Sequence, residues 1–435
     1  MIQVPLQSLP SDDALLLAAL RREGPVNLPR AYEVMDQFNL QGLVLGDPLN
    51  VFHLLGYWPQ LANTRVGQPP TTFALLSRDP RQTPGLVMSR FMYYYSYADG
   101  EFARDLQVHL YQEVGDSDAS AALDLPRECA DQGRAPLSRV ELRRRAQLDA
   151  ALQARVSVAD SAAALRRAMR EMGLWQGRIA FDHDVIRQVC NRHQHPGEMV
   201  PAENILRWIR LVKSPLEIAL MRRAASANAA ALIAVGQGVR ANQSYQSLQQ
   251  SFLIEAAKRG NRAVFLNVDR VSSELVDERV VDGQTLFLDA VSHYMHYHGD
   301  YARTVFVGEP LPAAREAAQA AALGWRAIRD TLKPGLRYSQ LVATGQDAIR
   351  RSGFAARIGF GPHSVGLMHT DEPGEESGGF HRKLDLTLRE NMILSVDCPV
   401  LDTGVGGSAH IEDLMLITAS GAEPIHEIGE AVLRV

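Results

Sequence analysis

Cysteine is scarce in this sequence of 435 residues, which contains only Cys129, Cys190 and Cys398. Three widely spaced cysteines form neither a disulfide framework nor a zinc ribbon, and they suit a reducing compartment. A basic amino-terminal segment followed by an apolar core is also absent, so the sequence shows no secretory signal. We therefore expect a cytoplasmic protein.

Long apolar runs and concentrated positive charge are missing as well. No segment reaches the roughly 18 consecutive apolar residues that a membrane span requires. The net charge is −5 and the pI is about 6.2, and no stripe of lysine and arginine is interleaved with aromatic residues. Short basic stretches such as residues 141–145 are typical of solvated helix faces. We expect neither a membrane nor a nucleic acid as a partner.

The composition is that of an ordinary globular protein, with 46% hydrophobic and 22% charged residues. A chain of this length can bury the cores of two domains. Helix and strand patterns alternate in residues 1–207, which predicts an α/β domain, and we expect a second domain over residues 208–435. The elements expected in the first domain are a helix at 28–38, two strands within 42–58, a hairpin at 73–89, a helix at 140–172 and a strand at 178–184.

The second domain opens with a helix signal at Ser214, Pro215 and Glu217. Serine is a preferred N-cap, proline suits the first helical position, and a glutamate three residues after the cap completes a capping box. This helix is expected to end at Gly236 or Gly238, and further helices are expected at residues 313–332 and 338–352. Strand patterns lie between and after them without a strict strand–helix–strand repeat, which predicts an α+β domain.

Four acidic residues and one histidine stand out in this domain because of their surroundings: Asp289, Asp300, His363, Asp397 and Glu412. Each carboxylate lies within or beside a short apolar run, rich in β-branched residues, that predicts a buried strand. A buried unpaired charge is costly, and a cation can neutralise several carboxylates at once. Pairing with a separate arginine or lysine would explain any one of them, but it is the weaker account of all five. Oxygen ligands with one imidazole favour manganese, iron, cobalt or zinc over copper.

Asp289 and Asp300 are expected on adjacent antiparallel strands joined by a turn over residues 294–299. Pairing across such a hairpin would bring side chains on one face to within about 5 Å of each other. His293, His296 and His298 cluster at the presumed turn. They could line a cleft or lie in solvent, and we expect solvent.

The motifs that contain these residues are RLVKSPLEIALMRRAA, LFLDAV, GDYARTVFVG, GPHSVGL, NMILSVDCP and HIEDLMLIT. In order and spacing they resemble the pita-bread metallopeptidase superfamily, which includes prolidase, aminopeptidase P, methionine aminopeptidase and creatinase. The resemblance covers about residues 205–420. The earlier phrase LNVFHLLGY is similar to the creatinase-like amino-terminal domain of prolidases.

The resemblance implies a pita-bread carboxy-terminal domain, a creatinase-like α/β amino-terminal domain and a homodimer. It also implies that the five residues bind two divalent metal ions and that the substrate is a short Xaa-Pro peptide. His369 is the expected proton-transferring group because imidazole titrates near neutral pH, although a structural role stays open. It follows His363 by six positions, where the family has seven. Arg303 either orients a carboxylate or forms a surface salt bridge.

The sequence departs from the family at several of these positions. Asp397 replaces a glutamate and is one methylene shorter, and His410 replaces an arginine. Peptidases of the family also carry a histidine on the strand before the first aspartate, and this stretch holds Asn267 and Asp269 instead. We count Asp269 among the candidate catalytic residues.

Two alternatives to an Xaa-Pro peptidase therefore stay open. One is an enzyme of the same fold that acts on a small molecule, such as a dimethylsulfoniopropionate lyase or creatinase. GYWPQ, PPTTFALLSRDP and GLMHTDEP are similar to those lyases, whereas Val291 stands where the lyases have a second aspartate. The other is a pseudoenzyme whose altered ligands no longer bind metal.

Overall fold

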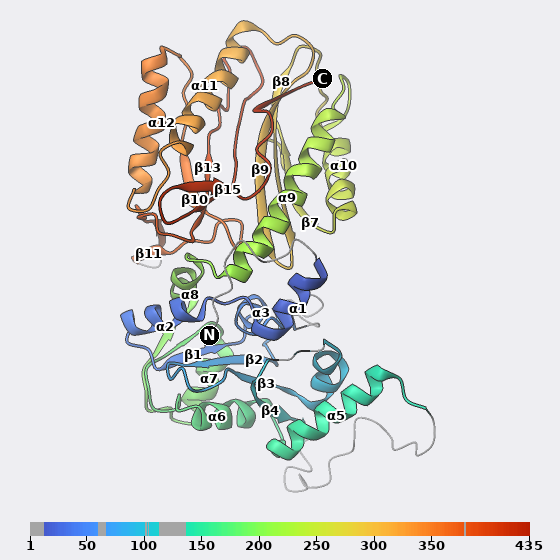
Figure 1. Cartoon of the computed structure of the whole chain (residues 1–435), viewed down its shortest axis with the longest axis vertical. Coiled ribbons are helices and arrows are strands. Elements are labelled where there is room, and N and C mark those ends of the chain that lie inside the picture. The colour runs from blue at the N-terminus through green and yellow to red at the C-terminus, as the bar shows by residue number, and fades with distance from the viewer. Residues whose placement is uncertain (1–12, 60–66, 101, 103, 113–135, 378–379) are drawn as a thin grey trace. The chain divides into compact units, whose positions relative to one another are not determined.

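The computed structural model describes residues 13–59, 67–100, 102, 104–112, 136–377 and 380–435 (Figure 1). Cys129 lies outside this part of the chain, whereas Cys190 and Cys398 are buried free thiols. The chain divides into two compact units, of which one ends at Ile209 and the other begins at Arg210. Each unit is built around its own sheets and apolar core.

A six-stranded sheet forms the centre of the amino-terminal unit, in the order β4-β3-β2-β1-β5-β6. The β1–β2 and β2–β3 pairs are antiparallel, and the other neighbours are parallel. The strands are β1 (Gly42–Leu45), β2 (Phe73–Ser77), β3 (Gly85–Ser89), β4 (Gln107–Tyr111), β5 (Ile179–Phe181) and β6 (Met199–Pro201). The helices are α1 (Asp13–Glu23), α2 (Leu28–Gln37), α3 (Pro48–Leu55), α4 (Arg90–Met92), α5 (Arg139–Ala154), α6 (Ser161–Glu171), α7 (Asp184–Arg192) and α8 (Glu203–Arg210), with a π-helical turn at Tyr93–Tyr97 and a 3₁₀ turn at Ala98–Gly100.

Alternate residues of β1 are buried in two separate cores. Leu43 and Leu45 pack with residues of α2 and α3, whereas Val44 packs with residues of α6 and α7. Successive side chains of a strand point to opposite faces, so an unbroken apolar run marks a strand that is covered on both sides. This arrangement is the α/β architecture that the sequence predicts.

Two predictions in this unit were wrong. Residues 48–55 form helix α3 and not a second strand: the Asp47 side chain accepts a hydrogen bond from Leu49 N, Pro48 lies at the first helical position, and Gly56 ends the helix at φ 74°. The Asp-Pro pair is therefore a helix start and not a turn between strands. The single helix expected over residues 140–172 is two helices, α5 and α6, each with its own N-cap, Ser138 and Asp160. The hairpin β2–β3 and strand β5 are confirmed.

The carboxy-terminal unit contains two four-stranded sheets, β16-β9-β8-β7 and β10-β13-β14-β15, and the short pair β11-β12. Its strands are β7 (Arg262–Val268), β8 (Thr285–Tyr294), β9 (Tyr297–Phe306), β10 (Gly361–Ser364), β11 (Gly374–Ser377), β12 (Phe380–Lys383), β13 (Ile393–Asp397), β14 (Met415–Ile417), β15 (Ala422–Pro424) and β16 (Val432–Arg434). Its helices are α9 (Pro215–Gln237), α10 (Tyr245–Lys258), α11 (Pro312–Arg329) and α12 (Tyr338–Ser352). Helix α9 packs on β8 and β9, α10 packs on β7, and α11 packs on α12 (Figure 1). The strands and helices form an α+β unit, as predicted.

Helix α9 begins with the predicted capping box, in which Ser214 Oγ accepts from Glu217 N and the Glu217 side chain accepts from Ser214 N. Among the helices in the described ranges, α9 alone is long and apolar enough to cross a membrane. Buried helices of soluble proteins pass the same test, and 61% of its most apolar stretch is buried. Its contacts with β8 and β9 make it the core helix of this unit.

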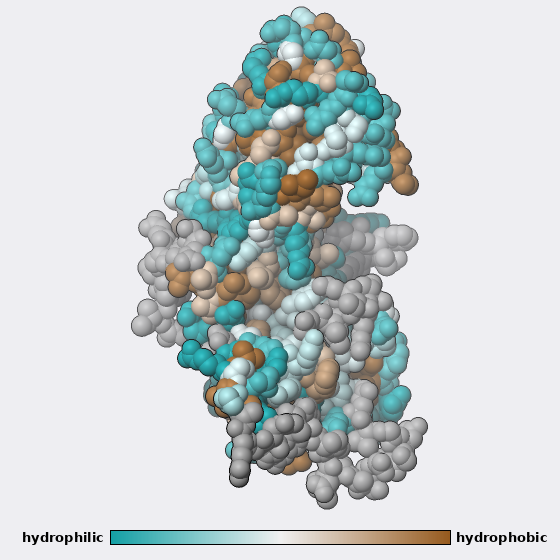
Figure 2. All heavy atoms as spheres, turned by 90° about the vertical axis from the view of Figure 1, so that its right-hand side faces the viewer, coloured by the Kyte–Doolittle hydropathy of each residue, from teal (hydrophilic) through white to brown (hydrophobic). Residues whose placement is uncertain are grey.

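The surface beside α10 mixes polar and apolar side chains. Figure 2 shows this side of the molecule, where hydrophobic areas are interspersed with hydrophilic ones. Leu253 and Ile254 of α10 and Val264 of β7 are among the exposed apolar residues. Apolar residues that are scattered in this way are normal on protein surfaces.

The hairpin β8–β9 is longer than predicted, because its turn consists only of Met295 and His296. Both residues have positive φ, 46° and 65°, as a two-residue turn between twisted strands requires. In the resulting register Asp289 is opposite Ala302, and Asp300 is opposite Val291. Residues directly opposite each other project to the same face, so both aspartates lie on one face as diagonal neighbours.

We predict that Gly299→Ala destabilises the protein by about 1–3 kcal/mol, because β9 lies against α9 at this point. A Cβ at position 299 would be 2.7 Å from Asn228 Cβ and 2.8 Å from Ala225 Cα. Urea unfolding measures the change. Gly359→Ala is the control, since a Cβ there meets nothing within 4 Å. Equal unfolding midpoints for the two variants would contradict the packing argument.

Candidate metal centre

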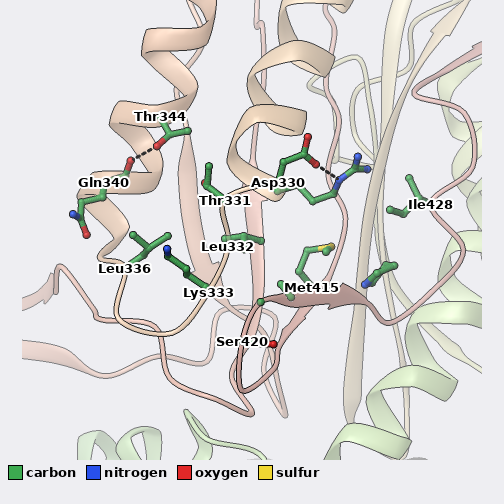
Figure 3. A pocket seen from close by; sticks show the side chains of 14 residues that line it. Asp330, Thr331, Leu332, Lys333, Leu336, Gln340, Thr344, Met415, Ser420 and Ile428 are labelled. Carbon is green, nitrogen blue, oxygen red and sulfur yellow. Dashed lines mark hydrogen bonds and ion pairs between the residues drawn. The ribbon is translucent and has the colours of Figure 1, made fainter.

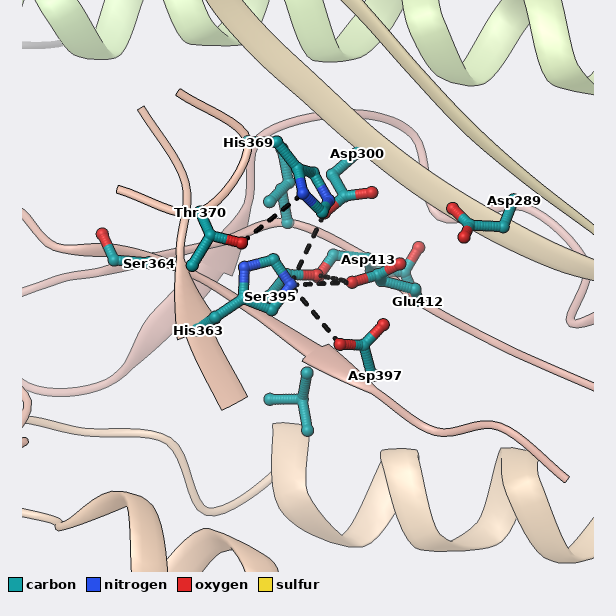
Figure 4. A network of polar contacts seen from close by, with 12 residues as sticks. Asp289, Asp300, His363, Ser364, His369, Thr370, Ser395, Asp397, Glu412 and Asp413 are labelled. Atoms are coloured by element: carbon teal, nitrogen blue, oxygen red, sulfur yellow. Dashed lines mark hydrogen bonds and ion pairs between the residues drawn. The ribbon is translucent and has the colours of Figure 1, made fainter. Parts of the chain in front are cut away.

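Five strands or strand-like segments bring the five predicted ligands together (Figure 4). Asp289 and Asp300 come from β8 and β9, His363 from β10, and Asp397 from the end of β13. Glu412 lies in the segment before β14, which is bridged to β9 through Ala302. Two sheets therefore contribute to one cluster, although the residues are spread over more than a hundred positions.

His363 is at the centre of one side of the cluster. Its Nε2 atom lies 3.3 Å from Glu412 Oε1, 3.6 Å from Asp300 Oδ2 and 3.7 Å from Asp397 Oδ2. One atom each from His363, Asp397 and Glu412 lies within 4.8 Å of the others, and the same holds for Asp289, Asp300 and Glu412. The five predicted ligands thus form two adjoining groups of three that share Glu412, and His369 forms a third group with Asp300 and His363.

The donor set fits cations because three of its buried carboxylate oxygens accept no hydrogen bond from a described residue. Asp300 is fully buried, and neither of its carboxylate oxygens accepts a hydrogen bond from a described residue. The same is true of Asp289 Oδ1. In the described ranges, the ion pairs of Asp300, Asp397 and Glu412 are with histidines, not with arginine or lysine. Separate basic partners, the alternative explanation for these carboxylates, are not what the structure shows.

Burial and mutual repulsion set the protonation of the carboxylates. Burial raises the pKa of Asp289 to about 6, and the charge of Glu412 adds to the effect. Burial, and then the charge of Glu412, also holds the pKa of Asp300 well above its usual range. Burial alone would raise the pKa of Glu412, but hydrogen bonds with His363 and His410 bring it well below its usual range. Without added positive charge, these effects favour the neutral forms of Asp289 and Asp300.

His369 lies at the open edge of the cluster. Its Nε2 atom is 3.0 Å from Asp300 Oδ2, and 37% of its side chain is exposed. Its ring packs edge-on against Phe265, with 5.7 Å between ring centroids. Despite the interval of six residues from His363, the loop brings the two rings to a centroid distance of 5.2 Å.

Arg303 is not part of a surface salt bridge, and it does not contact the five carboxylate and imidazole groups. It is fully buried, and its guanidinium donates to the carbonyl oxygens of Ala302 and Glu412 and to Asp413 Oδ1 at 2.7 Å. It therefore holds the backbone that presents Glu412. This placement makes Arg303 a positioning residue, in keeping with the expected role of orienting a carboxylate.

Asp269, the other predicted catalytic residue, also lies apart from the cluster. Its carboxylate accepts from Ser408 Oγ and Tyr245 Oη and pairs with Arg270 at 3.3 Å. In a continuous strand it would share a face with Asn267, but β7 ends at Val268 and Asp269 has φ 45°. The turn redirects its side chain toward these partners, and a catalytic role for Asp269 stays a prediction.

Three further polar residues contact the predicted ligands: Asn267 and His410, both departures from the family pattern, and Ser395, which was not predicted. Asn267 Nδ2 donates to Asp289 Oδ2 at 2.8 Å, and Ser395 Oγ donates to Glu412 Oε1 at 2.6 Å. His410 Nε2 lies 3.5 Å from Asp397 Oδ1 and 3.6 Å from Glu412 Oε2. Ser395 and His410 each precede a predicted ligand by two positions, the interval that returns a strand to the same face. That spacing was the available signal.

Two interactions of His410 compete. Burial would lower its pKa, but hydrogen bonds to Asp397 and Glu412 raise the pKa to about 10. Its Nδ1 atom also accepts from Cys398 N at 3.3 Å, which only an unprotonated Nδ1 can do. The carboxylates favour the charged ring in the metal-free protein, whereas the backbone hydrogen bond favours the neutral ring.

The three histidines of the hairpin are not free in solvent, contrary to expectation. The His293 ring stacks on His296 and lies beside His298, each at a centroid distance of 5.4 Å. All three side chains are partly buried. Burial lowers the pKa of His296 to about 3 and that of His298 to about 4.

A pocket of about 810 Å³ lies elsewhere in this unit, between the ends of α11 and α12 and the β14–β15 turn (Figure 3). Its lining includes Arg329, Lys333, Gln340 and Met415. None of the five predicted ligands lines it, so this pocket is separate from the candidate metal centre.

Residues 219–419 match metallopeptidase family M24. The match covers slightly less than half of the chain and lies within its carboxy-terminal unit. The family implies a dinuclear metal site, and the cluster at the meeting of the two sheets is the candidate for it in this chain. The predicted pita-bread family is confirmed.

Curated relatives support the same family at low identity. The chain is 23% identical to an Xaa-Pro dipeptidase of Pyrococcus horikoshii over 240 residues and 24% identical to one of Pyrococcus furiosus over 243 residues. Each match covers 52% of this chain, and 65% and 66% of the respective relatives. The chain thus matches slightly less than two thirds of the length of these relatives.

Solved structures extend the likeness to nearly the whole chain. An Xaa-Pro dipeptidase from Bacillus anthracis has a TM-score of 0.65 at 17% identity and covers 94% of this chain and 99% of its own. The dipeptidase PepE from Mycobacterium ulcerans has a TM-score of 0.60 at 18% identity, and the match covers 98% of this chain and 100% of the PepE chain. These structures show a prolidase-like fold, with an α/β amino-terminal domain before the M24 domain, and they confirm the predicted fold class.

We predict that Mn²⁺ or Zn²⁺ raises the unfolding temperature of the wild-type protein and that Asp300→Asn abolishes this shift. At a metal concentration of about 100 times Kd, a bound ion stabilises the folded state by about 2.7 kcal/mol. Metal-free Asp300→Asn should be at least as stable as the metal-free wild type, because the amide removes the cost of burying a carboxyl group beside Glu412. Scanning calorimetry with and without metal measures both effects. Asp347→Asn, on the exposed face of α12, is the control and should keep the shift; a normal shift in Asp300→Asn would contradict the assignment.

Proposed function

We propose that this protein hydrolyses short Xaa-Pro peptides, with a dipeptide as the preferred substrate, and that it requires two divalent ions of manganese, zinc, cobalt or iron. The convergence of four carboxylates and His363, with His369 at the open edge, carries the proposal. The names of the Pyrococcus relatives support the choice of substrate.

The chain's own residues supply binding and proton transfer in this reaction. When bound, the ions supply an acidified water and polarise the scissile carbonyl. His363 Nε2 and the carboxylates of Asp289, Asp300, Asp397 and Glu412 would hold them, while Ser395 and Arg303 keep Glu412 in place. The water oxygen bonds to the carbonyl carbon and the bond from this carbon to the proline nitrogen breaks. His369 Nε2 at the edge of the site delivers the proton that this nitrogen takes up.

Two further features belong to the proposal. We place the protein in the cytoplasm because its few cysteines suit a reducing compartment. We also propose a homodimer, which rests on the family resemblance. Sedimentation at micromolar concentration tests the second feature, and a monomer would count against it.

The direct test is hydrolysis of Ala-Pro and Leu-Pro by protein loaded in turn with each of the four metals. We expect His369→Ala to lower kcat by about 100-fold or more, the usual contribution of a general acid, while the metal-induced rise in unfolding temperature persists. Ala-Ala is the control substrate. The proposal is wrong if none of the four metal-loaded forms cleaves a peptide bond before proline.

One observation favours a second candidate, an enzyme of this fold that acts on a small non-peptide molecule. Asn267 takes the position where peptidases of the family have a histidine, and its amide is already bonded to Asp289 Oδ2. The chain therefore lacks one imidazole that would face a peptide. Turnover of creatine or dimethylsulfoniopropionate by protein that is inert toward Xaa-Pro dipeptides would favour this candidate.

We predict that Asn267→His increases Xaa-Pro hydrolysis relative to wild type, because it restores an imidazole beside Asp289. The ratio kcat/KM for Ala-Pro measures the gain, which should reach about 10-fold if the imidazole takes part in proton transfer. Asn267→Ala is the matched control, since it removes the same hydrogen bond without adding a titrating group. Equal activity of the two variants would show that this position does not limit peptide hydrolysis.

A further inference from the structure

The loop that carries His369 is short and closed upon itself. It leaves β10 at Ser364 and returns at Asp371, whose backbone N donates to Ser364 O at 2.8 Å. Inside the loop, Gly366 N donates to Met368 O at 3.0 Å. His369 and Thr370 are partly exposed or exposed, whereas Ser364, Asp371 and Glu372 are buried. His369 thus lies at the exposed tip of the loop, whereas the two ends of the loop are buried.

A buried ion pair lies at the end of the loop. Arg210 and Asp371 are 1% and 0% exposed, and Arg210 Nε lies 2.9 Å and 3.1 Å from the two carboxylate oxygens of Asp371. Asp371 Oδ2 also accepts from Leu367 N at 3.2 Å, inside the loop. The carboxylate fits closely against the loop backbone, since a Cβ at Gly366 would lie 2.8 Å from Asp371 Oδ2. Asp371 therefore links the loop to a residue 161 positions away.

Two further charged residues hold the start of the loop. Glu372 Oε2 accepts from Ser364 N at 3.0 Å and from Tyr338 Oη at 3.0 Å. Lys213 Nζ, also buried, donates to Ser364 Oγ at 3.0 Å. Both contacts fall on the residue directly after His363. The segment before α9 and the residues after His369 therefore fix one short loop from two sides.

Burying these charges is costly, and apolar residues of similar size would often stabilise a fold as well or better. An ion pair differs from apolar packing in its direction, because the guanidinium and the carboxylate must meet in a defined geometry. Here the ion pair between Arg210 and Asp371 fixes the position of the backbone from Leu367 to Asp371, the segment that contains His369. The distance of 3.0 Å between His369 Nε2 and Asp300 Oδ2 depends on that backbone.

We propose that Arg210 and Asp371 are positioning residues for His369, whose buried ion pair sets the place of the imidazole relative to Asp300. The activity part of this inference rests on the proposed function. Because Asp371 contacts the loop at Leu367, we expect the ion pair to affect proton transfer more than the binding of metal or substrate.

The experiment compares Asp371→Asn in the wild-type and His369→Ala backgrounds of the metal-loaded protein. In the wild-type background we expect kcat for Ala-Pro to fall by about 10- to 100-fold with little change in KM, as for a misplaced catalytic group. In the His369→Ala background the same substitution should leave kcat unchanged, because the group it positions is gone. In the single variant Asp371→Asn, the metal-induced rise in unfolding temperature should equal that of the wild-type protein. An equal loss of kcat in both backgrounds, or a lost metal shift, would overturn the inference.

Asp182→Asn is the matched control, because this carboxylate of the amino-terminal unit also accepts backbone hydrogen bonds, from Gly46 N and Asp47 N. It should leave kcat unchanged. Arg210→Lys provides a second variant if Asp371→Asn does not fold: it keeps the charge but loses the two-point geometry, and a smaller decrease in kcat is expected. An Arg210→Lys variant with wild-type kcat would also contradict the proposal.

Hydrogen exchange separates this inference from the proposed function. In Asp371→Asn the Leu367 amide should exchange at least about 10-fold faster than in wild type, since its acceptor is weakened and the loop opens more often. Asp182→Asn should leave that amide unaffected. A wild-type protein without dipeptidase activity would refute the proposed function while this measurement still tests the ion pair, and unchanged exchange would refute the role of Asp371.

Discussion

The repulsion between four carboxylates held within a few ångströms of one another is the constraint on which the rest of this structure depends. Asp300 and Glu412 are almost completely buried, and burial together with neighbouring charge raises the pKa of Asp289 and Asp300. Such a group of acids does not assemble by its own attraction. The surrounding sheets and helices must hold it in place, and divalent cations then compensate the charge.

The region behind the cluster shows how this is done. Glu412 and Asp413 are neighbours in an extended segment, so their side chains point in opposite directions. Glu412 faces the cluster, whereas Asp413 accepts from Arg303 Nη2 and Trp325 Nε1, both at 2.7 Å. Arg303 also donates to the carbonyl oxygens of Ala302, Glu412 and Glu430. The carboxylate of Glu412 faces the metal site. The hydrogen bonds of Asp413, on the other side of the same backbone, hold it in place.

Local signals in the sequence predicted much of the carboxy-terminal unit. The capping box at Ser214 and Glu217, the helix Tyr338–Ser352 and the pairing of β8 with β9 follow from short patterns. The same kind of pattern misled where one signal has two meanings. Asp47-Pro48 is typical of a turn, but it is also a strong helix start, and the apolar residues after it form α3. The hairpin turn was predicted too long because the histidines beside it are strand residues with polar side chains.

The sequence by itself determined which residue types are available for metal binding and that they lie in buried strands, since apolar runs around isolated acids are a local property. Only the tertiary structure decided which polar residues share the cluster. Asn267 faces Asp289 and Asp269 does not, because the strand ends between them. Ser395 joins the site through β13 and His410 through the segment before β14, and Arg303 turns away from it toward Asp413. The face to which a strand residue projects, and the residue at which the strand ends, depend on contacts across the whole unit. A short stretch of sequence does not contain that information.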